Sequence, residues 1–165
     1  MKALTIAIVL IGALTVAHAA NLRAEIEASG KKIAAAMKKR DFATLSKEMK
    51  AGTTADFKYV EGGQSETLDQ MLEHMKDGLG MMTKITTCSV KLLTLKEKGN
   101  TAVGTMRHTM AGTMKGDGKK THSMTYTGVS EDTYVKQDGK WKMSSMTWKS
   151  QKQTIDGKPV PGMGQ

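Results

Sequence analysis

The sequence contains few of the residues that build several common kinds of small protein. Of its 165 residues, one is cysteine, two are proline and 4% are aromatic. A single cysteine excludes a disulfide framework and a cysteine-rich zinc module, and two prolines exclude a collagen-like or proline-rich fibre. The scarcity of aromatic residues also argues against nucleic acid as a partner, because single-stranded nucleic acids are commonly bound by stacking bases on aromatic rings.

Basic residues outnumber acidic ones. There are 25 Lys and Arg against 16 Asp and Glu, which gives a formal net charge of +9. Charged turns commonly keep sheet edges soluble, whereas a basic surface can also attract an anionic ligand, a polysaccharide or a membrane surface. The sequence leaves both interpretations open. Two expected hairpins carry most of the clustered lysines, which are Lys115, Lys119 and Lys120 in one and Lys136, Lys140 and Lys142 in the other.

The first residues have the pattern of a secretory signal peptide. Lys2 gives a short positive start, residues 4–16 form a nearly unbroken apolar run, and Ala17-His18-Ala19 is a small-x-small cleavage site. The apolar run is too short for a helix to cross the roughly 30 Å hydrocarbon layer. We expect cleavage after Ala19, a domain over residues 20–160, a flexible tail over 161–165, and a periplasmic or secreted protein. The alternative is an uncleaved N-terminal anchor.

Apolar residues at helical spacing predict three helices in the N-terminal half. We expect Asn21 to cap the first helix and Asp41 to cap the second. Thr67 and Gln70 have the spacing of a capping box, which would start the third. The expected apolar faces are Leu22, Ile26, Ile33 and Met37 in the first helix, Phe42, Leu45 and Met49 in the second, and Leu68, Met71, Leu72, Met75 and Leu79 in the third.

Alternation of polar and apolar residues predicts one strand at residues 54–60 and four long strands later in the chain. The later strands are expected at 84–95, at 102–114, from 122 onward, and at 141–150. The tail from residue 156 is expected to be loop-like. This order of elements predicts an α+β domain, a cone-shaped curved antiparallel β-sheet with three N-terminal-half helices packed on its concave face.

The turn at residues 116–118 sets the expected pairing of the two central strands. A three-residue hairpin loop pairs Met114 with His122, which sets Met110 opposite Tyr126 and His108 opposite Gly128. Trp141 and Trp148 are seven residues apart, so strict alternation places them on opposite faces of the last strand.

Methionine takes the place of leucine and phenylalanine in the expected core. The sequence has 14 methionines, and they recur at core-like positions in helices and strands alike. A core rich in methionine is soft and adaptable.

Four short segments resemble the nuclear transport factor two-like superfamily, and within it the SnoaL-like and ketosteroid isomerase-like branch. They are residues 39–45, 55–63, 132–142 and 155–160. The resemblance implies a cone-shaped fold and often a homodimer formed through the sheet. Its members include isomerases, cyclases, dehydratases, non-catalytic ligand binders and interaction modules, so the resemblance implies no single activity.

The concave side of such a sheet is the expected place for a pocket. The candidate lining residues are Met106, His108, Met110, His122, Met124, Tyr126, Trp148 and Asp56. A histidine near its ordinary pKa can act as an acid or a base, or simply line a pocket. The isomerase-like members use a carboxylate base, for which Asp56 is a candidate here, although the end of a strand is the alternative place for it.

We expect no cofactor and no metal. Thioether and imidazole groups together suit Cu(I), but the use of methionine as core filler explains the same pattern. The sequence has no His-x-x-x-His motif or carboxylate cluster suited to zinc. Cys88 is expected to be a small buried side chain, with a reactive thiol or an intermolecular bridge as alternatives.

The leading hypothesis is an exported domain that binds a small, mostly apolar molecule in its cone, with His108 or His122 as the polar contact. One alternative is an enzyme of the isomerase, dehydratase or cyclase type with a pocket His or Asp as base. Another is a non-catalytic interaction or dimerisation module whose cone is filled with side chains. The expected partners are a small apolar or anionic ligand and a second copy of the chain, without nucleic acid and without a membrane span.

Overall fold

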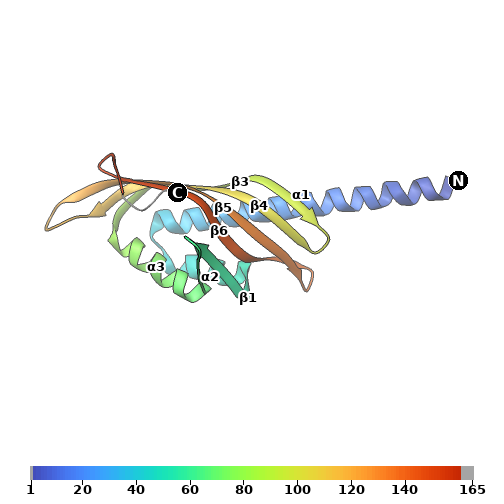
Figure 1. Cartoon of the computed structure of the whole chain (residues 1–165), viewed down its shortest axis with the longest axis horizontal. Helices are drawn as coiled ribbons and strands as arrows, with labels where there is room; N and C mark the ends of the chain where they lie inside the picture. Colours follow the sequence, from blue (N-terminus) through green and yellow to red (C-terminus); the bar gives the residue numbers. More distant parts are fainter. Residues whose placement is uncertain (1, 161–165) are drawn as a thin grey trace.

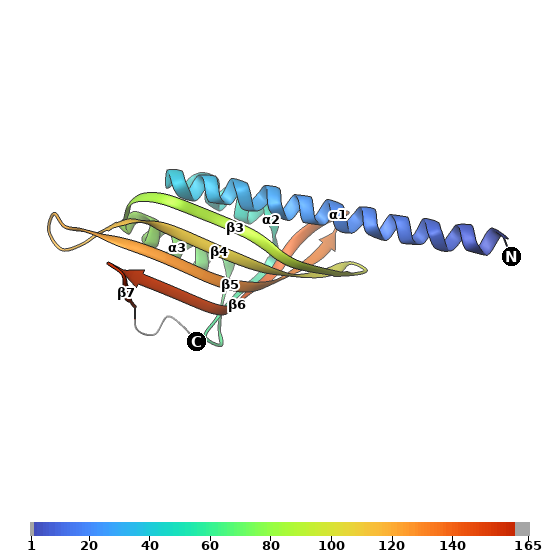
Figure 2. The same ribbon diagram turned by 90° about the horizontal axis from the view of Figure 1, so that it is seen from above.

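The computed structural model describes residues 2–160, and the predicted tail at 161–165 lies outside the described residues. Within them, three helices lie against one side of a curved seven-stranded sheet (Figures 1 and 2). No helix in this part of the chain has an apolar stretch long enough to span a bilayer. The elements are α1 (Lys2–Lys39), α2 (Phe42–Gly52), β1 (Thr53–Glu61), β2 (Gln64–Glu66), α3 (Leu68–Met81), β3 (Met82–Lys98), β4 (Thr101–Lys115), β5 (Thr121–Gln137), β6 (Lys140–Ile155) and β7 (Lys158–Pro159).

The α+β fold and the curved sheet are as the sequence predicts, but the sheet is mixed. Its strand order is β2-β1-β6-β5-β4-β3, and β7 pairs with β6. Strands β3 to β6 form an antiparallel meander, whereas β1 runs parallel to β6. The parallel pair arises because α3 and the whole meander intervene between these two strands. Residues 156–160, expected to be loop-like, are more ordered than predicted, since Val160 donates its backbone N–H to the carbonyl of Gln153 at 3.0 Å.

Two of the three predicted helix starts are confirmed. The Asp41 side chain accepts the backbone N–H of Thr44 at 3.0 Å, and Thr67 and Gln70 form the reciprocal capping box of α3. The predicted start of the first helix at Asn21 was wrong, because α1 begins at Lys2 and runs through Asn21. The alanines around position 19 are strong helix formers and no glycine or proline separates them from Asn21. The Asn21 amide instead donates to Glu25, one turn along, at 2.9 Å.

The pairing of β4 with β5 has the predicted register. Met110 lies opposite Tyr126 and His108 opposite Gly128. The Gly116 N–H closes the hairpin by donating to the Lys120 carbonyl at 2.9 Å.

The prediction for the two tryptophans was wrong because β6 is irregular. Its register against β5 shifts between Thr133 and Tyr134, where Ser144 is left without a partner. One extra residue in a strand exchanges the faces of all residues that follow it. Trp141 and Trp148 therefore both face the helices.

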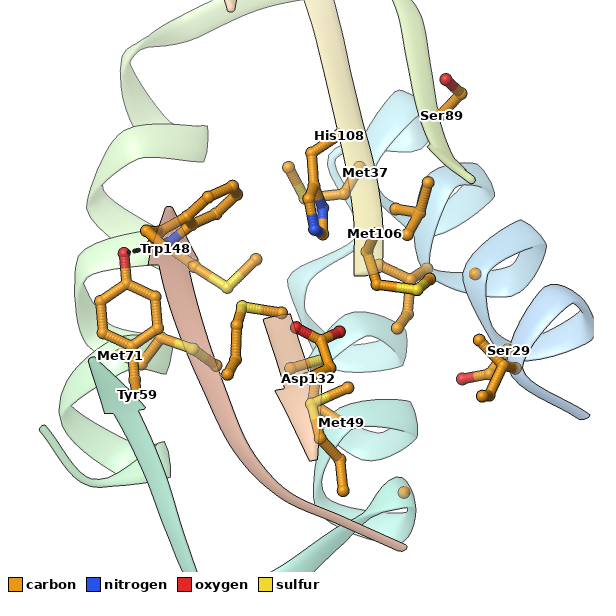
Figure 3. A pocket seen from close by; sticks show the side chains of 18 of the residues that line it. Ser29, Met37, Met49, Tyr59, Met71, Ser89, Met106, His108, Asp132 and Trp148 are labelled. Atoms are coloured by element: carbon orange, nitrogen blue, oxygen red, sulfur yellow. Dashed lines mark hydrogen bonds between the residues drawn. The ribbon is translucent and has the colours of Figure 1, made fainter. Parts of the chain in front are cut away.

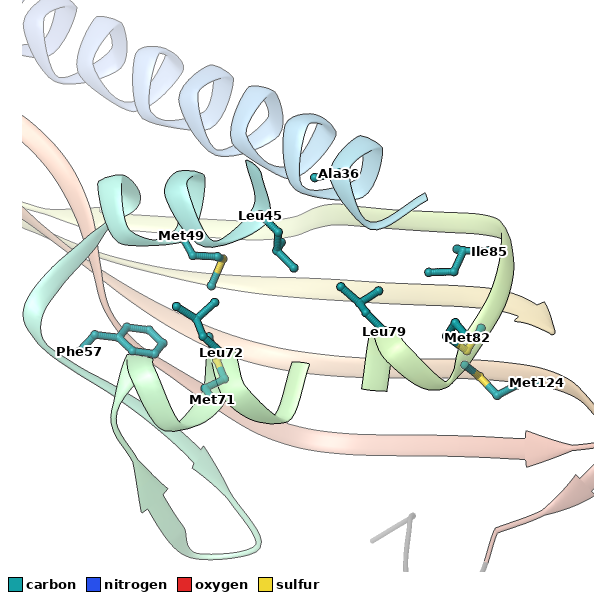
Figure 4. Packing of buried hydrophobic residues seen from close by; sticks show 10 residues of the cluster. All are labelled: Ala36, Leu45, Met49, Phe57, Met71, Leu72, Leu79, Met82, Ile85 and Met124. Carbon is teal, nitrogen blue, oxygen red and sulfur yellow. The ribbon is translucent and has the colours of Figure 1, made fainter. Parts of the chain in front are cut away.

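Methionine does occupy the core, as predicted. The larger buried cluster joins the helices to β1, β3 and β5 (Figure 4), and Met49, Met71, Met82 and Met124 belong to it. A second cluster contains Met106 and joins the start of the domain to the other end of the sheet.

Gly112 on β4 allows β3 to approach closely. A Cβ atom at this position would lie 2.1 Å from the Lys84 carbonyl oxygen and 2.9 Å from the Met82 methyl group. We expect Gly112→Ala to destabilise the protein by about 2 kcal/mol or more in urea unfolding, because backbone has to move. Gly78→Ala is the matched control, since a Cβ there meets nothing within 4 Å and alanine favours the helix. Equal stability of Gly112→Ala and the wild type would contradict this packing.

Candidate functional site

A cavity of about 540 Å³ lies between the helices and the concave face of the sheet (Figure 3). Its walls come from α1, α2, α3, β1 and the four long strands. Unbranched thioether side chains make up much of the surface. The methionines that line it are Met37, Met49, Met71, Met75, Met106, Met110, Met143 and Met146.

Five of the predicted lining residues border this cavity, namely Met106, His108, Met110, Tyr126 and Trp148. They come together because alternate residues of β4 and β5 face the helices, and because the irregularity in β6 turns Trp148 to the same side.

The other three predicted lining residues lie elsewhere. Met124 is 6% exposed within the larger buried cluster. His122 is near the hairpin end of β5, where its Nδ1 lies 2.6 Å from Asp156 Oδ2 and both side chains contact solvent. Asp56 is exposed because its neighbour Phe57 faces the core, so alternation along β1 turns the carboxylate outward.

A buried chain of hydrogen bonds runs along the cavity wall through residues of β4 and β5. His108 Nε2 lies 2.9 Å from Ser130 Oγ, and Ser130 Oγ donates to Asp132 Oδ1 at 2.7 Å. The Tyr134 hydroxyl lies 3.5 Å from the other oxygen, Asp132 Oδ2. Ser130 is fully buried and Asp132 is 1% exposed. Because Ser130 donates its one proton to Asp132, it accepts from His108 Nε2–H, which leaves Nδ1 as the free acceptor.

Burial moves the pKa values of both ends of this chain. It lowers the pKa of His108 to about 4, so the imidazole is neutral at physiological pH. It raises the pKa of Asp132 to about 7, although the hydrogen bonds from Ser130 and Tyr134 oppose that rise. Burial likewise raises the pKa of the Tyr134 hydroxyl. A pair of groups whose pKa values are moved by burial and that share a hydrogen-bond chain is typical of functional sites.

A second polar network joins β1, β5 and β6 on the same wall. Trp148 Nε1 donates to the Tyr59 hydroxyl at 2.8 Å, and that hydroxyl donates to Glu61 Oε2. Gln151 Nε2 donates to Glu61 Oε1 at 2.6 Å and accepts from the Tyr126 hydroxyl at 3.0 Å through its carbonyl oxygen. Both Glu61 oxygens therefore have partners, and burial raises the pKa values of the two tyrosines.

Trp148 connects the two networks. Its ring packs edge to face against the imidazole of His108, with the ring centroids 4.7 Å apart. It also packs edge to face against Tyr126, with centroids 5.8 Å apart and an interplanar angle of 89°. Gly128, opposite His108, leaves room for it, because a Cβ there would lie 2.6 Å from the indole. Substitution of this glycine would displace the Trp148 indole from its contacts with His108 and Tyr126.

Several residues of these networks were not predicted from the sequence, namely Tyr59, Glu61, Ser130, Asp132, Tyr134 and Gln151. A usable signal was present for three of them. The register that places Tyr126 inward also places residues 130, 132 and 134 inward, because each lies an even number of positions away. Glu61 is the last residue of β1, and Gln151 follows a register shift in β6 between Trp148 and Ser150, so alternation gave no such signal for them.

The site offers limited options for a metal. Among residues 2–160, no three His, Cys, Asp or Glu side chains converge. The donors that do line the cavity are thioethers, His108 and the half-buried Cys88, a set that would suit Cu(I) better than zinc. Burial raises the pKa of the Cys88 thiol, which favours the unreactive protonated form.

Comparisons with known proteins agree with the fold. The SnoaL-like domain family matches residues 18–147. No curated protein shows significant similarity to the chain. Solved structures with the same fold are similar at low sequence identity, and so they support the fold alone.

Three of these structures illustrate the similarity. A nuclear transport factor 2-like superfamily protein from Salmonella enterica has 17% identity and a TM-score of 0.58, covering 88% of this chain and 99% of its own. Hexachlorocyclohexane dehydrochlorinase LinA-type3 from Novosphingobium barchaimii has 16% identity and a TM-score of 0.59, covering 88% and 94%. The Kfla4162 protein from Kribbella flavida has 15% identity and a TM-score of 0.58, covering 78% and 91%. The chain belongs to the SnoaL-like domain family and has the nuclear transport factor 2-like fold.

Proposed function

We propose that the cavity binds a small, mostly apolar molecule that carries one hydrogen-bonding group. The observation that supports this most directly is a partly open cavity of about 540 Å³ that His108 and Asp132 both line. Ligand sites of proteins commonly have volumes of about 300–1,000 Å³, apolar walls and a few placed polar groups. An interaction module with a filled cone, the alternative from the sequence, would not need this space.

Fluorescence of a neutral apolar dye such as prodan tests this proposal. We expect wild-type protein to bind the dye with a blue-shifted emission, because the dye leaves water for a methionine-lined wall. His108→Ala should weaken binding roughly tenfold, since it removes the imidazole against Trp148. His122→Ala is the matched control, because His122 pairs with Asp156 at the surface. Absence of binding to the wild type, or equal effects of the two variants, would refute the proposal.

A second candidate function is proton transfer to or from a bound molecule, as in an isomerase, dehydratase or cyclase. The hydrogen-bond chain from His108 through Ser130 to Asp132 favours it. His108 would accept a proton at Nδ1, and Asp132, when ionised above its pKa of about 7, would stabilise the resulting imidazolium through Ser130. Two proteins of the same fold are hexachlorocyclohexane dehydrochlorinases, so the fold can hold an enzyme site.

The protonation of Asp132 should be visible in the pH dependence of stability. Its pKa is raised from 3.8 to about 7, so the folded state binds a proton more tightly than the unfolded state. Stability from this group is therefore fully present below pH 4 and is lost as the pH rises through 7. Between those limits, wild type should lose about 4 kcal/mol relative to Asp132→Asn, at about 1.4 kcal/mol for each pKa unit. The free energy of unfolding of each protein is measured in urea from pH 4 to pH 8. The raised pKa is refuted if the difference between the two free energies does not change with pH.

Proton exchange in heavy water tests the catalytic candidate. NMR can follow deuterium incorporation at the acidic carbon of unsaturated cyclic ketones, used as apolar probes. We expect wild-type protein to exchange the probe faster than buffer alone. His108→Ala should lower the exchange rate about a hundredfold, a typical contribution of a general base. Ser130→Ala should lower the exchange rate less, because it interrupts only the hydrogen bonds between His108 and Asp132. His122→Ala should have the wild-type rate. Exchange at the buffer rate, or full activity of His108→Ala, would refute this candidate.

We also propose that the protein is exported. The support is the pattern of residues 1–19, with its positive start, apolar run and cleavage site. Mass spectrometry of protein purified from the host's periplasm or medium would find an N-terminus at Ala20 if the proposal holds. A mature protein that retains Met1–Ala19 would refute it.

A further inference from the structure

The charged residues around the cavity differ from those of the chain as a whole. The sequence has 25 Lys and Arg against 16 Asp and Glu. Among the described residues that line the cavity there is no Lys or Arg, but there are four carboxylates, those of Glu25, Glu61, Glu66 and Asp132. The described lysines and arginines thus do not line this cavity, and its four acidic side chains outnumber its two histidines.

Asp132 has an acceptor oxygen that the protein satisfies poorly. The side chain is 1% exposed, and Oδ1 accepts a normal hydrogen bond from Ser130 at 2.7 Å. Among the described residues, Oδ2 has one partner, the Tyr134 hydroxyl at 3.5 Å, well beyond the usual O–H···O length of about 2.7 Å. Figure 3 shows the carboxylate directed into the space that His108 and Met106 border. Such a carboxylate is costly to ionise, in agreement with its pKa of about 7, and a cationic donor beside Oδ2 would favour the ionised form.

Aromatic rings stand on the same wall. Trp148, Tyr59 and Tyr126 all line the cavity, and Trp148 Nε1 is fixed to the Tyr59 hydroxyl at 2.8 Å. Tyr126 and Trp148 meet edge to face, with their planes at 89° and their centroids 5.8 Å apart. Aromatic faces attract ammonium groups, most of all when the group has left water. Glu61 accepts a hydrogen bond from the Tyr59 hydroxyl, which adds a carboxylate next to these rings.

From these observations we infer that the ligand is a cation: a protonated amine or methylated ammonium group on an apolar body, with its charge between Asp132 and the rings of Trp148 and Tyr59. This inference rests on the proposed binding function and names its ligand class. It replaces the expectation of an anionic ligand, because among the described lining residues an anion would meet four carboxylates and no lysine or arginine. The two histidines there already have partners, Glu66 for His74 and Ser130 for His108.

The positive charge of the whole chain does not prevent this binding. Surface lysines act on a ligand through water and salt, where the screening length is about 8 Å at physiological ionic strength. Inside the cavity the effective dielectric constant is about a quarter of that of water, so the same charge pair interacts roughly four times more strongly. The near carboxylates therefore decide the sign of the ligand, and the distant lysines have little influence.

Three naphthalene probes with the same ring and different charge test the inference. They carry an aminomethyl, a hydroxymethyl or a carboxylate group at the same ring position, and binding to wild-type protein is measured by calorimetry at neutral pH. We expect the ammonium probe to bind roughly tenfold or more tightly than the alcohol, and the carboxylate probe to bind more weakly than the alcohol. Equal or tighter binding of the alcohol would overturn the inference and leave the proposed function standing. If none of the probes binds, the proposed function itself fails.

Two variants with the same charge change locate the interaction. Asp132→Asn should weaken binding of the ammonium probe roughly tenfold and leave the affinity for the alcohol probe nearly unchanged. Asp117→Asn is the matched control, because Asp117 is exposed in the β4–β5 hairpin, and it should change neither probe. An ammonium preference that survives in Asp132→Asn would overturn the part assigned to Asp132. The wild-type probe series remains decisive if Asp132→Asn fails to fold.

Discussion

The register of β4 against β5 is the constraint on which the whole site depends. His108 lies opposite Gly128, and every second residue of both strands faces the helices. A slip of β5 by one residue would turn Asp132 to the outer face and bring Glu131 inside, and a slip of β4 would exchange His108 for Arg107 in the same way. Either slip would bury an unpaired charge, which costs far more than a few hydrogen bonds return. The polar wall and the hydrophobic core thus specify the same pairing.

Much of the fold follows from local rules in the sequence. The caps at Asp41 and Thr67, the order of helices and strands, and the β4–β5 register were all predicted, because each depends on neighbouring residues or on one turn. The irregularity at Ser144 was not predictable in this way. Nothing in the sequence around this serine marks an extra residue, and its effect is a change of face for Trp148 that only the paired sheet reveals.

The candidate site was predicted only in part, for a related reason. Its apolar and aromatic members recur at strand spacing, whereas Ser130 and Asp132 lie in a polar stretch that has low strand propensity on its own. They are inside because the long hairpin carries them there, and the chain accepts a buried carboxylate at that position. Residues that oppose local preference and are held in place by the surrounding structure are often functional.

The methionine lining determines how a guest molecule would be selected. Thioether side chains have three rotatable bonds and no branch, so eight of them around one space can rearrange for guests of different outline. His108, Trp148 and Tyr59, by contrast, are held by hydrogen bonds and ring contacts. Such a receptor discriminates poorly between shapes and well between polar head groups. Under the proposed binding function, the expected occupant of such a space is a family of molecules that share one head group rather than a single compound.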